Sequence, residues 1–82
     1  MDLRLQPVRV AIGLDEEGML VFAHDRLVAV LVQLSEEHEE LGIAGHWFLE
    51  TSYGFRLPGR PPLFPDLDAA QAWISQQLTG SV

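Results

Sequence analysis

The sequence predicts an α+β fold, a four-stranded antiparallel β-meander with one C-terminal α-helix packed on one face of the sheet (β-β-β-β-α). Apolar residues recur at every second position near the N-terminus and around Trp47, as expected for strands with one buried face. Residues 27–34 are almost entirely apolar. Apolar residues take a clear helical spacing in residues 67–78. Together these patterns indicate strands first and a single helix last.

The first strand is predicted at residues 8–14, where apolar side chains alternate with small or charged ones. Its apolar positions are Val8, Val10, Ile12 and Leu14. Residues 15–18 (Asp-Glu-Glu-Gly) are expected to form a hairpin turn, in which Gly18 supplies a positive φ. The second strand then returns over residues 19–23.

The third strand is predicted at residues 27–34, after a turn formed by His24, Asp25 and Arg26. It is the least polar strand, so we expect it at the centre of the sheet. Because side chains alternate across a sheet, one face should receive Leu27, Ala29 and Leu31. The other face should receive Val28, Val30, Val32 and Leu34. Both faces are therefore apolar, and one helix can cover only one of them.

A fourth strand is predicted at residues 45–53, beyond a solvated acidic loop at residues 35–40 (Ser-Glu-Glu-His-Glu-Glu). One of its faces is expected to carry Trp47, Leu49, Thr51 and Tyr53. The other is expected to carry His46, Phe48, Glu50 and Ser52. The proline-rich residues 55–65 are interpreted as an extended crossover, because proline is excluded from helix interiors and central strands.

The C-terminal helix is predicted to begin near Leu67, with Asp66 as its N-cap, and to end at Gly80. Its apolar stripe consists of Leu67, Ala70, Trp73, Ile74 and Leu78. We expect Trp73, Ile74 and Leu78 to pack on the sheet.

The composition indicates one globular domain spanning residues 1–82, since 48% of the residues are hydrophobic. The chain has 12 acidic residues against 5 arginines and a net charge of -7, which disfavours nucleic acids and anionic membranes as partners. A basic protein would be the electrostatically easier partner. The chain has no cysteine, which excludes thiol redox chemistry and suits a reducing cytoplasm. No apolar run is long enough to span a membrane.

The sequence contains no catalytic, metal or nucleotide motif, so we expect no enzymatic activity, no cofactor and no metal. His38 begins a His-Glu-Glu-Leu-Gly segment that resembles the start of the zinc motif HExxH. Gly42 stands where that motif requires its second histidine. Glycine-rich phosphate-binding loops are absent.

Two groups of residues are candidates for binding. Aromatic and arginine side chains are common in binding surfaces, which singles out the segment that carries His46, Tyr53, Phe55, Arg56 and Arg60. The alternative is that its aromatic residues belong to the core. The uncovered face of the sheet is expected to pack against a second copy in a two-fold dimer. The residues assigned to that contact are Phe22, Val30, Val32 and Phe48.

The leading interpretation is a small, acidic, non-enzymatic interaction or accessory protein that forms a homodimer through its sheet and works in the cytoplasm. One alternative is an acidic inhibitor or antitoxin-like protein that neutralises a basic partner. Another is a small-molecule binder with a pocket between sheet and helix, in which His46, Tyr53 or Arg56 would be the polar anchors. The composition is similar to that of many short bacterial proteins.

Overall fold

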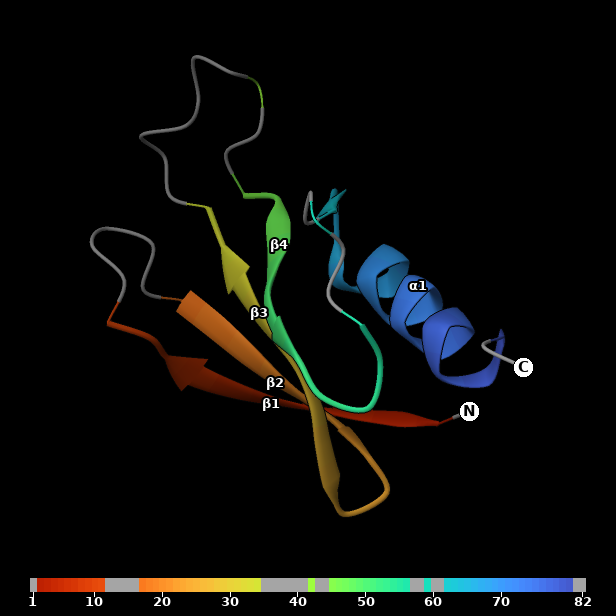
Figure 1. The fold of residues 1–82 in the computed structure, drawn as a ribbon. Helices are drawn as coiled ribbons and strands as arrows, with labels where there is room; N and C mark the ends of the chain where they lie inside the picture. Colours follow the sequence, from red (N-terminus) through yellow and green to blue (C-terminus); the bar gives the residue numbers. More distant parts are fainter. Residues whose placement is uncertain are drawn as a thin grey trace.

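The computed structural model describes residues 2–11, 17–34, 42, 45–56, 59 and 62–80. Within these residues, five antiparallel strands form one sheet in the order β1-β2-β3-β4-β5, followed by one helix (Figure 1). The elements are β1 (Leu3–Arg9), β2 (Glu17–Ala23), β3 (Arg26–Gln33), β4 (Trp47–Ser52), β5 (Leu63–Phe64) and α1 (Leu67–Gly80). The predicted α+β meander with a C-terminal helix is confirmed, and β3 is the central strand as expected.

Strand β1 begins earlier than predicted. It spans Leu3–Arg9 and pairs with β2 along its whole length, whereas the sequence pattern placed the first strand at residues 8–14. The physical reason is that Leu3 and Leu5 pack against the core, which fixes this segment at the sheet. Pro7 is tolerated because β1 is an edge strand. Ile12 and Leu14 lie outside the described residues.

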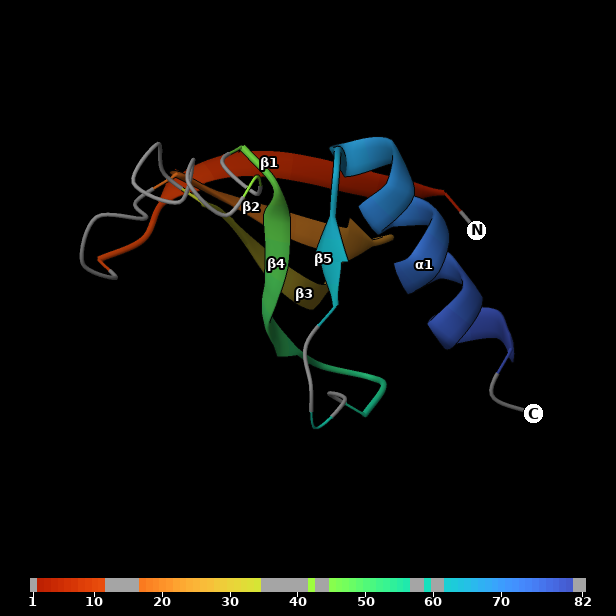
Figure 2. The same ribbon diagram turned by 90° about the horizontal axis from the view of Figure 1, so that it is seen from above.

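Strand β5 is a short addition to the predicted meander. Leu63 and Phe64 pair with Phe48 and Trp47 of β4, between two prolines of the crossover. Such prolines fit here because β5 is the outer strand, whose free edge needs no donor. Seen from above, β5 leads directly into the start of α1 (Figure 2).

A bulge in the β2–β3 pair changes which residues of β3 face the helix. Val21 pairs with Ala29, but Phe22 pairs with Leu27, so Val28 is left without a partner in the ladder. Val28 consequently joins Ala29 and Leu31 in the core. Leu27 shares the opposite face with Phe22. The predicted alternation is therefore wrong at Leu27 and Val28.

A second bulge, in the β3–β4 pair, has the same consequence for β4. Val30 pairs with Thr51 while Leu31 pairs with Leu49, which leaves Glu50 as the extra residue. Ser52 pairs with Ala29 and so lies on the helix side, while Thr51 lies on the other. These two residues exchange the faces that strict alternation assigns to them.

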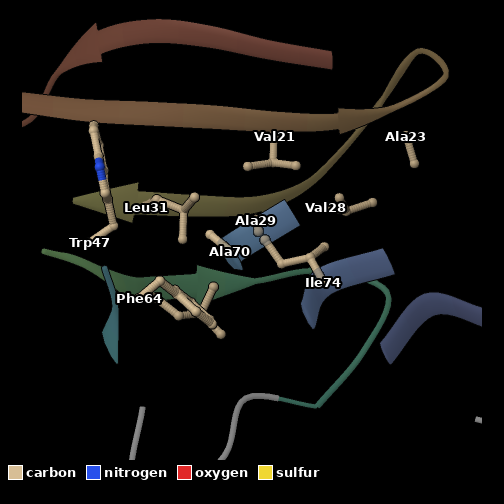
Figure 3. Close-up of a cluster of buried hydrophobic side chains, with 10 residues drawn as sticks. Val21, Ala23, Val28, Ala29, Leu31, Trp47, Phe64, Ala70 and Ile74 are labelled. Atoms are coloured by element: carbon tan, nitrogen blue, oxygen red, sulfur yellow. The ribbon is translucent and has the colours of Figure 1, made fainter. Parts of the chain in front are cut away.

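The hydrophobic core fills the space between the twisted sheet and α1 (Figure 3). Ala70 and Ile74 of α1 are fully buried. Trp73 lies against two more rings, with its ring centroid 5.8 Å from that of Phe55 and 5.7 Å from that of Phe64. Trp73 and Leu78 also pack against the buried cluster, which confirms the predicted contacts of the helix.

The ends of α1 match the prediction. The backbone N–H of Ala69 donates a hydrogen bond of 2.8 Å to Oδ1 of Asp66, so Asp66 caps a helix that begins at Leu67 and ends at Gly80. The helix is not long and apolar enough to cross a membrane, and the described residues contain no other helix.

Gly18 has a different role from the predicted one. It lies inside β2 rather than at a turn, and its φ is not in the left-handed region. A Cβ at this position would come within 2.5 Å of Cγ2 of Val10. Glycine is therefore needed here for close packing of β1 and the residues that follow it against β2.

Candidate functional site

Strand register divides the sheet into a face covered by α1 and an open face. Val21, Ala29, Leu31 and Leu49 belong to the buried cluster and define the covered face. The paired residues that alternate with them lie on the other side of the sheet. This open face consists of Arg4, Gln6, Val8, Gly18, Leu20, Phe22, Leu27, Val30, Val32, Phe48, Thr51 and Leu63.

All four residues predicted to contact a second copy lie on the open face. Val32 pairs with Phe48, Val30 lies two positions away on β3, and Phe22 lies on the neighbouring strand β2. Phe22, Val30 and Phe48 are half-buried. Val32 has no solvent-exposed surface in the single chain, so it cannot itself contact a partner.

The open face is apolar and free of acidic residues among its paired positions. Its one charged member is Arg4, whose guanidinium carbon lies 4.5 Å from the centroid of the Phe22 ring. This is a cation–π contact that covers part of the ring. The described residues include six acids, and none of them is a paired residue of the open face: Glu17 pairs with Arg9 on the covered side of the sheet, and Asp2, Asp25, Glu50, Asp66 and Asp68 have no partner in the strand ladders.

A pocket of about 520 Å³ lies where the β2–β3 turn, the end of β4 and the last turns of α1 meet. Its lining residues are Ala23, His24, Arg26, Leu27, Val28, Tyr53, Gly54 and Leu78. Tyr53 is 54% exposed, so the pocket opens to solvent beside this ring.

The structure describes four of the five residues predicted to form a binding surface, and it separates these four. Tyr53 lines the pocket. Phe55 packs on Trp73, and Arg56 is exposed outside the pocket lining. His46 lies just before β4, at the opposite end of this strand from Tyr53. Arg60 lies outside the described residues.

His24 and Arg26 were missed as pocket residues. His24 and Asp25 form a two-residue turn between the paired residues Ala23 and Arg26, and His24 has a φ of 60°. The sequence signal that points to them is the short polar turn itself, because a tight hairpin brings its flanking side chains to the end of the sheet.

The acidic loop that would carry the inhibitor interpretation, residues 35–40, lies outside the described residues, and His38 with it. Its base is described. Leu34 N–H donates to the carbonyl of His46 at 2.8 Å, and Gly45 N–H donates to the carbonyl of Leu34 at 3.0 Å. These bonds extend the β3–β4 pairing by one step beyond Gln33 and Trp47.

The described residues contain no group of three or more histidine or acidic side chains able to hold a metal ion. No known protein family, curated protein or solved structure matches this chain. Its function has to be inferred from its own residues.

Proposed function

We propose that this chain is a small non-enzymatic interaction protein of the cytoplasm that forms a two-fold dimer through the open face of its sheet. The observation that carries the proposal is the open face itself, an apolar surface without a paired acidic residue on an acidic protein. Contiguous apolar surface of this kind is typical of protein contact sites.

The charge of the chain favours the open face over the rest of the surface as the place where a second copy binds. Each copy carries a net charge of -7, and the repulsion is weakest where acidic residues are absent from the contact. The apolar residues span neighbouring strands, from Phe22 on β2 through Val30 on β3 to Phe48 on β4. In a two-fold dimer each such patch meets its own equivalent, so an apolar surface is self-complementary.

A basic protein is a poorer partner for this face. Electrostatic complementarity would require acidic side chains opposite the partner's cations, and the one charged residue among the paired positions of the open face is Arg4. A basic partner would therefore have to bind elsewhere on the chain. Dimerisation through the open face leaves the outer side of α1, on the opposite face of the sheet, available for such a partner.

The contact can be located by isotope-filtered NMR on a mixture of ¹³C-labelled and unlabelled chains. We expect intermolecular NOEs between the methyl groups of Val30 and the rings of Phe22 or Phe48, because all three side chains are half-buried on the open face. Intermolecular NOEs confined to exposed helix residues such as Gln76 would contradict the proposal. A sample of dimer mass without NOEs from Val30 would contradict it as well.

A further inference from the structure

The pocket at the β2–β3 turn combines an apolar floor with a polar rim. Ala23 and Val28 are buried, and with Leu27 and Leu78 they present aliphatic surface from two strands and the helix. The rim carries three exposed polar side chains, those of His24, Arg26 and Tyr53. A volume of about 520 Å³ is within the range of small-molecule sites, roughly 300–1,000 Å³.

The three polar side chains of the rim are uncommitted. Within the part of the chain that the structure describes, none of them makes a hydrogen bond or an ion pair. His24 is also held at a φ of 60°, a conformation that residues other than glycine adopt infrequently. The turn thus places the free donor groups of His24 and Arg26 beside apolar surface at some conformational cost, and the Tyr53 hydroxyl is added from the end of β4.

We propose that this pocket binds a small monocarboxylic acid with an aromatic or aliphatic body. The planar guanidinium of Arg26 matches a carboxylate in a bidentate arrangement, and the body of the ligand would lie on the aliphatic floor and the ring of Tyr53. His24 and the Tyr53 hydroxyl are the further donors within the lining.

A phosphate or another polyanion fits the pocket less well. The lining offers one permanent cation, and the net charge of -7 repels multiply charged anions from the chain as a whole. A ligand with a single negative charge and a large apolar part gains from the floor and loses least to this repulsion. Of the residues that line the pocket, only Leu27 also lies on the open face. The pocket and the dimer contact are therefore almost entirely different surfaces, and each can be tested on its own.

The test is a ¹H–¹⁵N NMR titration of the full chain with 3-phenylpropionate. We expect saturable shifts confined to the amides of residues 23–28, 53–54 and 78. Arg26→Gln should weaken binding about tenfold, the typical effect of losing a hydrogen bond to a charged group. Arg56→Gln is the matched control, because Arg56 is an exposed arginine outside the lining, and it should change affinity less than about twofold.

The uncharged analogue 3-phenylpropionamide has nearly the same size and is expected to bind about tenfold more weakly than the acid. Equal affinity for the amide and the acid would overturn the carboxylate assignment. Equal weakening by Arg56→Gln and Arg26→Gln would show that overall charge, and not this pocket, attracts the ligand. Absence of saturable shifts at these amides would overturn the site altogether. None of these results depends on the mass of the protein in solution.

Discussion

Val30→Lys is expected to convert the dimer into a monomer, with the dimer dissociation constant raised by about a thousandfold or more. Val30 lies on the central strand, between Leu20 of β2 and Thr51 of β4, so it sits near the middle of the open face. In a two-fold contact each substitution places two unpaired ammonium groups in the interface. Leaving a charge buried without a partner costs about 3–5 kcal/mol.

The folded monomer should tolerate Val30→Lys, because Val30 is half-buried and the long lysine stem can carry its charge to solvent. Gln76→Lys is the matched control, since it adds the same charge at an exposed position of α1. Light scattering coupled to size exclusion should give a monomer for Val30→Lys and a dimer for Gln76→Lys. A dimer of undiminished stability in Val30→Lys, with an unchanged circular dichroism spectrum, would place the interface elsewhere.

Ile74→Ala is expected to destabilise the fold by about 2–5 kcal/mol. Ile74 has no solvent-exposed surface, and it packs in the cluster that joins α1 to the sheet (Figure 3). The loss is the sum of two free energies: the transfer free energy of the removed aliphatic groups and the cost of the cavity that remains. It is a large share of the roughly 5–15 kcal/mol that stabilises a typical domain.

Urea unfolding measures this loss most simply in the Val30→Lys background, where the unfolding of a monomer does not depend on protein concentration. Leu63→Ala is the control, because Leu63 is 44% exposed on β5 and should cost less than about 1 kcal/mol. Equal losses for the two substitutions would mean that α1 does not close the core through Ile74.

The helix and the central strand were predictable because local signals agree with the tertiary structure. Asp66 caps the helix and the stripe from Leu67 to Leu78 faces the core, so capping and periodicity indicate the same element. The long apolar run of β3 likewise indicates a strand with neighbours on both sides.

The faces of the strands were only partly predictable, because the two bulges depend on pairing between strands. Strict alternation puts Leu27 with Leu31 and Val28 with Val30, while the bulge reverses this for Leu27 and Val28. No feature of residues 26–33 taken alone reveals the extra residue. The start of β1 was missed for a related reason, since Leu3 and Leu5 become strand residues through their contacts with the core.

The candidate surfaces, like the faces of the strands, were only partly predictable from the sequence. Alternation groups Val30 with Val32 on one strand, but grouping them with Phe22 and Phe48 required the cross-strand register, which is not readable from the sequence; the structure places all four on the open face. The burial of Val32 could not be foreseen, because it depends on its neighbours in three dimensions. The pocket brings His24 and Arg26 to Tyr53 from a turn and a strand end far apart in sequence, and only the folded sheet shows that they meet.

The most direct test of dimerisation through the open face is the solution mass of the unmodified chain, measured by light scattering coupled to size exclusion across a dilution series. We expect a mass of twice the 9.2 kDa of one chain at high concentration. Dissociation on dilution should follow a single monomer–dimer equilibrium. A mass of 9.2 kDa at every concentration would contradict the proposal that the open face binds a second copy.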